Sequence, residues 1–467
     1  MLTACCRYRF AVSRPAVAAV TRQRTGRAEI LWLQSMGIMD AVLGLRGEVP
    51  WGGTQPRGLC HITLTDGRGE VIWRSGAPWA GEHPYLSHFA DGMMAVDAAP
   101  GRAPRVLCLA SQGGEGVLRF LDLGTGRMEG EVSLPRNDYT WVLCGRSDPA
   151  RGGRTVVLTT QDVGYYAGGH GRHSALFLDG EGGVIREVEV PGDGHFPACF
   201  DADGDGWDEF MLGYDLFDHD GEHLWRTDYW RRRRINLMRQ HADQVLIHRG
   251  LGEEGWTAVI PGSDALYRVD AGGRVLWRRR WHRWVRRKGV APWPVRTHVQ
   301  FVALGRLLAN DEREYVFVLH NRFGMSLVDL EGRVVWRGKL PENWPGGRPA
   351  CVEADSFHTG TPMVLWKNPL GTGQDLLVYN EAGWPYAVDG RGSRVVEFAW
   401  PAEARQADAF RLPGLSEAGA RPPYRPDDWG YGYRCLTEDI DDDGRQEVLI
   451  FDRRHCWVYG LEDGAAR

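Results

Sequence analysis

The chain has 467 residues, with 56 Lys and Arg residues against 61 Asp and Glu residues, and a formal net charge of -5 at pH 7. This mildly acidic balance argues against a protein whose whole surface binds nucleic acid. The length allows two or three ordinary domains or one large all-β body with a sizeable core. No apolar run reaches membrane-spanning length, so we expect no membrane contact.

The cysteines and the N-terminus bear on the compartment. The nine cysteines include no pair with zinc-ligand spacing, and most lie singly in apolar strand-like runs. Free buried thiols are typical of a reducing compartment, so we expect a cytoplasmic location. Residues 1–35 carry six arginines, and a Pro interrupts their only short apolar stretch, which argues against a secretory signal. We expect residues 1–35 to be a disordered or misassigned leader and residues 36–467 to be the folded part.

Two stretches share one spacing of acidic residues: the first acidic loop, residues 201–209 (DADGDGWDE), and the second acidic loop, residues 439–447 (DIDDDGRQE). Each has carboxylates at positions 1, 3, 5 and 9, and a glycine at position 6 where the chain must turn sharply. This spacing wraps oxygen ligands around one hard cation, although an acidic turn without metal is the alternative. We therefore expect two structural Ca²⁺ ions. Their predicted ligands are Asp201, Asp203, Asp205, Glu209, Asp439, Asp441, Asp443 and Glu447.

A hairpin phrase recurs along the chain at intervals of 39 to 60 residues. It consists of an alternating apolar run, an Asp, a Gly-rich turn and a second alternating run that often ends in Trp-Arg. Such alternation indicates a β-hairpin, and its recurrence about every 50 residues is typical of four-stranded propeller blades. The hairpins lie around Asp66, Asp122, Asp179, Asp218, Asp270, Asp329 and Asp389.

The pattern predicts an all-β fold, a single β-propeller of seven blades that the N-terminal segment closes. Eight blades is the alternative if residues 29–74 form a whole blade. An apolar pair of strands precedes each later hairpin, and we place residues 362–367 on the second strand of one such pair. A Pro-rich insertion at about residues 400–430 is expected to form a rim or lid.

Propeller geometry places the candidate groups on two faces. Turns between the first and second strands share a face with the Asp-Gly hairpins, and blade-to-blade connections lie on the other face. Both acidic loops are predicted first-to-second turns, so we expect the cations on the face away from the connections. Six residues before each loop, at the mouth of the innermost strand, stand His195 and Tyr433. Aligned positions hold Tyr139, His241 and His298, so we expect these side chains to ring the central opening, although capping of strand ends is the alternative.

The connection face also carries aromatic and basic segments. A Gly-rich loop, residues 164–173, contributes Tyr166 and His170. Residues 226–288 hold 16 Lys and Arg residues against 6 Asp and Glu residues, with tryptophans interleaved. Because sugar rings and bases both stack on indole, this composition favours ligand contact over a merely solvated arginine surface, which is the alternative.

Residues 195–227 (HFPACFDADGDGWDEFMLGYDLFDHDGEHLWRT), with the second acidic loop as looser support, resemble family-11 rhamnogalacturonan lyases. Those enzymes are calcium-dependent propellers, and FG-GAP-type, integrin-like propellers use the same metal motif. In the lyases a His-Gly-Asp phrase follows soon after; here His241-Ala-Asp243 stands in a similar place. The resemblance implies a carbohydrate-active propeller that cleaves a uronate-containing oligosaccharide by β-elimination.

β-Elimination needs a positive group on the uronate carboxylate, a base for the proton on the adjacent carbon, and an acid for the leaving oxygen. His241 is the candidate base, and Arg239 and Arg296 are candidate carboxylate clamps. The other candidate acids and bases are His195, His298, Tyr139, Tyr433, Tyr166 and His170. The expected partner is an acidic oligosaccharide or polysaccharide bound by a monomer. Two alternatives stay open: a non-catalytic propeller that binds acidic glycans or a protein, and nucleic-acid binding through the Arg/Trp connections.

Overall fold

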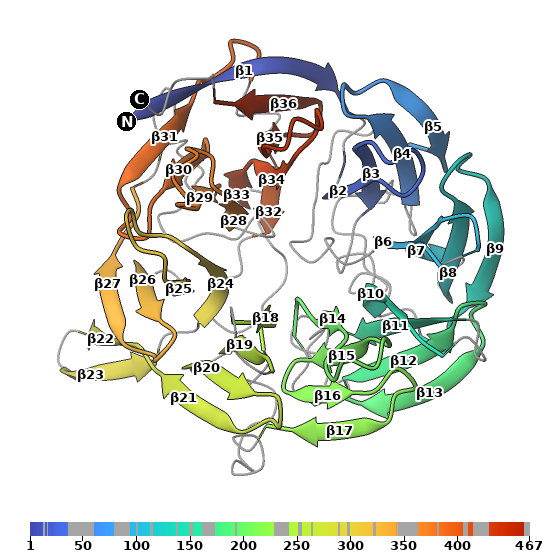
Figure 1. The fold of residues 1–467 in the computed structure, drawn as a ribbon, viewed down its shortest axis with the longest axis horizontal. Coiled ribbons are helices and arrows are strands. Elements are labelled where there is room, and N and C mark those ends of the chain that lie inside the picture. The colour runs from blue at the N-terminus through green and yellow to red at the C-terminus, as the bar shows by residue number, and fades with distance from the viewer. Residues whose placement is uncertain are drawn as a thin grey trace.

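The structure is a computed structural model. It describes residues 1–12, 15, 17–35, 60–78, 94–99, 101–112, 115–136, 139–148, 153–160, 173–191, 194–227, 242–250, 255–262, 265–287, 290–296, 299–320, 324–341, 343, 363–380, 383–404, 410–413 and 429–461. Every regular element in these ranges is a β-strand, and the strands form sheets arranged in a ring (Figure 1). The all-β prediction is confirmed, and the arrangement is consistent with a β-propeller. Among the same residues, no helix has the length and apolar character needed to cross a membrane.

Six sheets have four strands each, taken in chain order and paired antiparallel. The first three are β2 (Val17–Thr21), β3 (Glu29–Ser35), β4 (Cys60–Asp66) and β5 (Val71–Ser75); β6 (Met94–Asp97), β7 (Arg105–Gln112), β8 (Glu115–Asp122) and β9 (Met128–Ser133); and β10 (Tyr139–Arg146), β11 (Arg154–Thr160), β12 (Ser174–Asp179) and β13 (Val184–Glu189). The next three are β14 (Ala198–Phe200), β15 (Glu209–Leu212), β16 (Asp215–Phe217) and β17 (His223–Arg226); β18 (Leu246–His248), β19 (Thr257–Gly262), β20 (Ala265–Asp270) and β21 (Val275–Arg279); and β24 (Val299–Gly305), β25 (Tyr315–His320), β26 (Gly324–Asp329) and β27 (Val334–Gly338).

The last sheet has eight strands and contains both ends of the chain. Its order is β28-β29-β30-β31-β1-β36-β35-β34. The strands are β28 (Met363–Trp366), β29 (Leu376–Tyr379), β30 (Tyr386–Val388), β31 (Arg394–Phe398), β1 (Leu2–Ala11), β34 (Arg434–Glu438), β35 (Glu447–Phe451) and β36 (His455–Gly460). β1 pairs in parallel with β31 and antiparallel with β36, so an N-terminal segment does complete the last sheet, although it comes from the predicted leader. The prediction that residues 362–367 form a second strand is wrong, because β28 pairs only with β29 at the sheet edge.

Residues 1–35 differ from the leader that the sequence predicts, because β1, β2 and β3 lie within them. Ile30, Leu31 and Leu33 on β3 have no exposed surface, which explains why this segment folds with β4. β2, β3, β4 and β5 therefore form a complete four-stranded sheet, the arrangement on which the eight-blade alternative depends. Within the predicted insertion, β32 (Phe410–Pro413) pairs with β33 (Trp429–Gly432), and residues 405–409 and 414–428 lie outside the described ranges.

The seven predicted Asp-Gly hairpins are confirmed. In each turn, the N–H of a glycine donates to the carbonyl of the Asp three or four residues earlier, and the glycine has a φ between 69° and 87°. Only glycine adopts this left-handed conformation without strain, which explains the turn composition. The glycines are Gly69, Gly126, Gly182, Gly221, Gly273, Gly332 and Gly392.

The same glycines fit against the preceding sheet. A Cβ atom on any of the seven would come within 2.1 to 3.0 Å of a side chain there. At four junctions that side chain is the tryptophan of the Trp-Arg phrase: Trp73, Trp225, Trp277 and Trp336. The recurring Trp and the recurring Gly are therefore two halves of one contact between neighbouring sheets.

Candidate functional site: two acidic loops and the mouth of the inner strands

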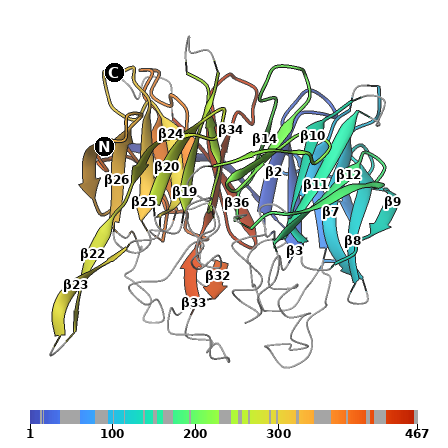
Figure 2. The same cartoon turned by 90° about the horizontal axis from the view of Figure 1, so that it is seen from below.

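The acidic loops and the basic connections lie at opposite ends of the sheets. The first acidic loop joins β14 to β15, and the second joins β34 to β35, so both connect the first two strands of their antiparallel series. The hairpin β22 (His282–Arg287) and β23 (Val290–Arg296) follows β21, the last strand of its sheet. Figure 2 shows this hairpin and β32–β33 projecting from one side of the ring. This is the separation of faces that the sequence predicts.

The first acidic loop folds back on its own carboxylates. Asp201 accepts a hydrogen bond from the backbone N–H of Gly204 at 2.7 Å. Glu209 accepts one from the N–H of Ala202, which closes the loop. These contacts bring carboxylate oxygens of Asp201, Asp203 and Glu209 within 4.8 Å of one another. Three of the four predicted ligands therefore converge.

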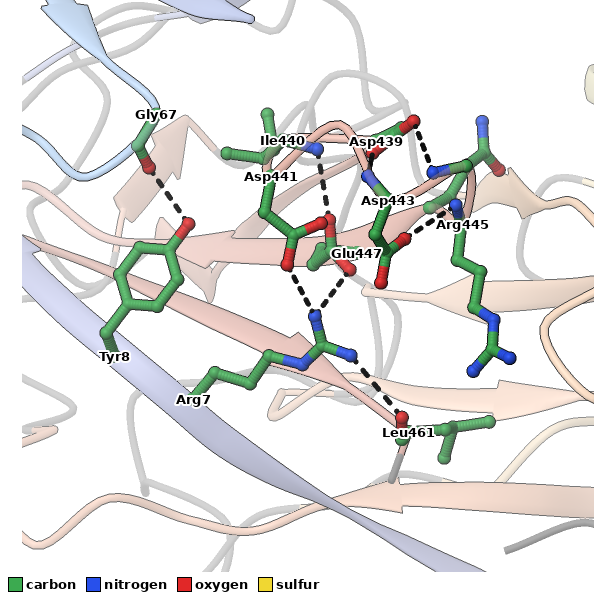
Figure 3. Close-up of polar contacts among 12 residues, drawn as sticks. Arg7, Tyr8, Gly67, Asp439, Ile440, Asp441, Asp443, Arg445, Glu447 and Leu461 are labelled. Atoms are coloured by element: carbon green, nitrogen blue, oxygen red, sulfur yellow. Dashed lines mark hydrogen bonds and ion pairs between the residues drawn. The ribbon is translucent and has the colours of Figure 1, made fainter. Parts of the chain in front are cut away.

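The second acidic loop repeats this design (Figure 3). Asp439 accepts a hydrogen bond from the N–H of Gly444 at 3.0 Å, and Glu447 accepts one from the N–H of Ile440 at 3.0 Å. Carboxylate oxygens of Asp439, Asp441 and Glu447 again lie within 4.8 Å of one another. The repeat of the sequence is thus also a repeat of the geometry.

The carboxylates at position 5 of the two acidic loops make other contacts. Asp205 accepts the N–H of Trp207 at 2.7 Å, and Asp443 accepts the N–H of Arg445 at 2.8 Å. Neither carboxylate belongs to the converging group of its loop, so six of the eight predicted ligands come together. A third converging group, Asp218, Asp220 and Glu222, was not predicted, because the hairpin phrase in which it lies explains these residues as a turn.

The chemistry of the donor set fits a hard cation. All the converging groups are carboxylate oxygens, which are the ligands that Ca²⁺ prefers. Burial raises the pKa of Glu209 to about 7, and the negative charges of Asp203 and Asp205 raise it further. Burial likewise raises the pKa of Glu447 to about 7. At the first acidic loop, a bound cation would supply positive charge to the crowded carboxylates around Glu209.

Each loop is also held by the sheet that follows it in the ring. The guanidinium of Arg249 donates to the carbonyl oxygen of Asp201, and that of Arg22 donates to the carbonyl oxygen of Asp439. Arg249 follows β18 and Arg22 follows β2, and each of these is the first strand of its sheet. The acidic loops therefore connect neighbouring sheets in addition to presenting carboxylates.

At the opposite end of the inner strands, His195 pairs with Asp243. Nε2 of His195 lies 3.7 Å from Oδ1 of Asp243, and the two residues are 7% and 0% exposed. His195 precedes β14, whereas Asp243 precedes β18 in the next sheet, where its N–H donates to the carbonyl of Pro261 at 2.8 Å. Gly194 allows this approach, because a Cβ there would lie 1.4 Å from the carbonyl oxygen of Ala242. The sequence marked His195, but its partner comes from another sheet.

Aromatic rings show that inner strands converge beside this pair. The ring of Phe196 lies 4.9 Å from that of Trp141 and 5.5 Å from that of Phe301. Trp141 lies on β10 and Phe301 on β24, so three sheets meet here. The predicted positions 139, 195 and 298 are each within three residues of one of these rings.

The predicted tyrosines are packed rather than open to solvent. Tyr139 is 4% exposed and Tyr433 is 1% exposed. The ring of Tyr433 lies 4.9 Å from Trp384 and 5.9 Å from Trp400. Arg296 ends β23, and the structure describes only its backbone. His241, His298, Tyr166, His170 and Arg239 lie outside the described residues.

The fold and the two loops define a β-propeller-like protein with paired acidic turns on one face and a buried histidine–carboxylate pair near the other. Comparisons with protein-family models and with curated proteins found no match.

Several solved structures share the fold. A rhamnogalacturonan lyase PL11 of Bacillus licheniformis is 16% identical, with a TM-score of 0.54, over 97% of this chain and 72% of that one. The exotype rhamnogalacturonan lyase YesX is 15% identical, with a TM-score of 0.57, over 96% and 72%. The V. cholerae biofilm matrix protein Bap1 is 10% identical, with a TM-score of 0.54, over 100% and 92%. These similarities show the fold that the sequence resemblance implies.

Proposed function

We propose that this chain is an eight-bladed propeller that acts on a uronate-containing oligosaccharide, by β-elimination of the kind that rhamnogalacturonan lyases catalyse. The observation that carries the proposal is the contact between His195 and Asp243, at 3.7 Å, where the inner strands of two sheets begin. Rhamnogalacturonan lyases share the fold, which supports the choice of substrate class.

The count of eight rests on the outer strands. In seven series of four strands, the fourth and outer strand directly follows the third in the chain, after an Asp-Gly hairpin turn. The remaining series, β34 to β36, has three strands and is completed by β1, which pairs with β36 in antiparallel order. β1 also pairs with β31 in parallel, which joins the last two blades into one eight-stranded sheet.

In the proposed reaction, His195 takes part in proton transfer. Asp243 would orient the His195 ring and stabilise the imidazolium after the ring takes up a proton. In β-elimination one group takes the proton from the carbon next to the uronate carboxylate, the carbon–oxygen bond to the leaving sugar breaks, and a second group protonates that oxygen. In this proposal His241, two residues before Asp243, is the base, and His195 in its protonated form is the second group, which gives its proton to the leaving oxygen. The other groups that the sequence proposes for this face are His298, Tyr139, Tyr433, Tyr166 and His170.

Neutralisation of the uronate falls to arginines in this proposal. The acidic loops lie at the far end of the inner strands from His195, so a cation held there supplies stability to the fold. Arg239 and Arg296, which the sequence places beside the connections, would bind the substrate carboxylate with two parallel hydrogen bonds.

A second candidate function is non-catalytic binding of acidic glycans. The burial of His195, with 7% of its surface exposed, favours it, because a proton-transfer group must reach the substrate. The two functions differ in whether bound sugar is cleaved.

The experiment compares the full-length protein with His195→Asn, Asp243→Asn and His223→Asn on uronate oligosaccharides. His223 is the matched control, because its Nε2 lies 2.7 Å from Oδ1 of Asp215 on the outer part of a sheet. Formation of unsaturated uronate is followed by its ultraviolet absorbance. We expect His195→Asn to lower the rate ~100-fold or more and His223→Asn to leave it unchanged. Binding on a glycan array without any absorbance change would favour the second function instead.

We extend the proposal to a cytoplasmic monomer. All eight cysteines in the described ranges are free thiols. Sedimentation of the purified protein and the effect of an oxidising buffer on its activity test these two points.

A further inference from the structure

The two acidic loops share a backbone design but differ in what faces their carboxylates. In the second acidic loop, Nη1 of Arg7 lies 2.9 Å from Oδ2 of Asp441 and 2.9 Å from Oε1 of Glu447 (Figure 3). In the first acidic loop the equivalent carboxylates belong to Asp203 and Glu209. Within the described part of the chain, neither of these has an arginine or lysine at ion-pair distance. Asp201 of the first loop does lie 3.7 Å from Nη2 of Arg146, but within the described residues only the second loop has one guanidinium in contact with two of its converging carboxylates.

A β-bulge directs Arg7 to that loop. Cys6 lies opposite Tyr459 and Tyr8 lies opposite Val458, so Arg7 is the extra residue of β1 where its register against β36 shifts. Bulges re-aim the side chain of the extra residue. Without the bulge, Arg7 would keep the strict alternation of the strand.

The end of strand β36 leaves space for the Arg7 side chain. A Cβ on Gly460, the last residue of β36, would lie 2.2 Å from Nε of Arg7. Nη2 of Arg7 donates to the carbonyl of Leu461 at 3.4 Å. The hydroxyl of Tyr8 donates to the carbonyl of Gly67 at 2.9 Å, so the next residue of β1 contacts the first sheet. A bulge, a glycine and two carboxylates thus all suit one guanidinium.

An ion and this guanidinium compete for one place. Ca²⁺ binds carboxylate oxygens at about 2.3–2.6 Å, so an ion shared by Asp441 and Glu447 would occupy the space in which Nη1 of Arg7 lies. The planar guanidinium satisfies both carboxylates with a single charge fixed to the chain. The position is therefore filled without metal as long as β1 is docked.

We propose that Arg7 is the built-in cation of the second acidic loop. It fastens the closing strand β1 to the last sheet without metal, and it leaves the first acidic loop as the one of the pair that takes an ion. This inference is independent of the substrate of the protein.

Calcium binding to full-length variants, measured by calorimetry, tests the inference. Asp203→Asn disables the first acidic loop. Because Arg7 fills the second loop, this variant should bind no ion there. Addition of Arg7→Gln to that variant should create one site, which a further Asp441→Asn change should remove. Arg9→Gln is the matched control for Arg7→Gln, because Arg9 lies on the same strand and pairs with Glu403 instead.

Thermal unfolding gives a readout that does not depend on ion binding. In the presence of chelator, Arg7→Gln and Gly460→Ala should both unfold several degrees below the parent, and Arg9→Gln should not. In the Asp203→Asn background, added calcium should raise the unfolding midpoint of the variant that also carries Arg7→Gln and leave the midpoint of the variant that keeps Arg7 unchanged. The inference is overturned if Asp203→Asn binds an ion that Asp441→Asn removes. It is equally overturned if replacement of Arg7 creates no site, or costs no more stability than replacement of Arg9.

Discussion

Phe10 packs so closely against Gly69 that a Cβ on this glycine would come within 2.1 Å of the phenylalanine ring. Phe10 lies on β1, the strand beside β36, and Gly69 lies in the β4–β5 turn of the first sheet. At four other junctions a tryptophan of the preceding sheet holds this position, as Trp73 does against Gly126. Phe10 therefore supplies at the junction of the chain ends the contact that the Trp-Arg phrase supplies between other sheets.

Loss of the Phe10 ring should weaken the closed ring of sheets. Phe10 is half-buried, so Phe10→Ala should lower the free energy of unfolding by about 2 kcal/mol, less than for a fully buried phenylalanine. Arg9→Ala, on the same strand, should change it by less than about 0.5 kcal/mol, as for most exposed ion pairs. Urea unfolding of both variants measures this. Equal losses would show that Phe10 does not close the ring.

The glycines of the hairpin turns should tolerate alanine poorly for two separable reasons. Gly332→Ala should cost the left-handed backbone strain, about 1–2 kcal/mol, and in addition a clash with Trp277, whose ring lies 2.8 Å from the added Cβ. Gly101→Ala should cost only the strain, because Gly101 has a φ of 77° and nothing within 4 Å. The difference in unfolding free energy between the two variants isolates the contact between sheets. No difference would mean that the turn and Trp277 do not press on each other.

Local patterns carried most of the fold prediction. Every Asp-Gly hairpin formed as expected, because the conformation of such a turn depends on the turn residues themselves. Strand β1 was missed, because its arginines alternate with half-buried residues and its partners lie over 380 residues away, as in the pairing of Leu2 with Val396. Pairing between distant segments leaves no periodic signal in either one.

The candidate site divides in the same way. The acidic loops were recognisable, because a loop binds with residues that are close in sequence, and six of the eight proposed ligands converge. The partner of His195 was not recognisable, because Asp243 belongs to another sheet and is 0% exposed. Arg7 was missed for the same reason, since only the β-bulge aims it at the second acidic loop.

Acid should destabilise the protein through His320, at the end of β25. This residue is 4% exposed, its ring lies 4.3 Å from Trp281, and its Nε2 lies 2.8 Å from Oγ of Ser326. Burial lowers the pKa of His320 to about 3, and the nearby charge of Arg337 lowers it further. The unfolded chain, with a pKa of about 6.5, therefore binds the proton more readily, and stability falls as pH falls from about 6.5 towards about 3.

Between pH 7 and pH 5, protonation linked to His320 should lower the free energy of unfolding by about 2 kcal/mol. His320→Gln keeps an amide for Ser326 and has no proton to gain, so its unfolding free energy should fall less between pH 7 and pH 5. Urea unfolding at the two pH values measures the difference. Parallel pH dependence in the two proteins would rule His320 out as the cause.

Removal of the cation should act through the first acidic loop. Calcium at about 100 times its dissociation constant should stabilise the parent by about 2.7 kcal/mol, and a chelator should reverse this. Asp203→Asn should abolish the increment, whereas Asp122→Asn, in a turn outside the converging acidic groups, should keep it. Thermal unfolding with and without calcium measures the increment. An unchanged increment in Asp203→Asn would place the ion elsewhere.

Mass analysis of the products from a rhamnogalacturonan-backbone oligosaccharide tests the proposed reaction most directly. β-Elimination adds no water, so the fragments should together have the mass of the substrate, and one should carry the double bond of an unsaturated uronate. His195→Asn should yield neither fragment at a comparable rate. Intact substrate after incubation of the full chain with a broad panel of uronate oligosaccharides, or fragments heavier by one water, would contradict the proposed β-elimination.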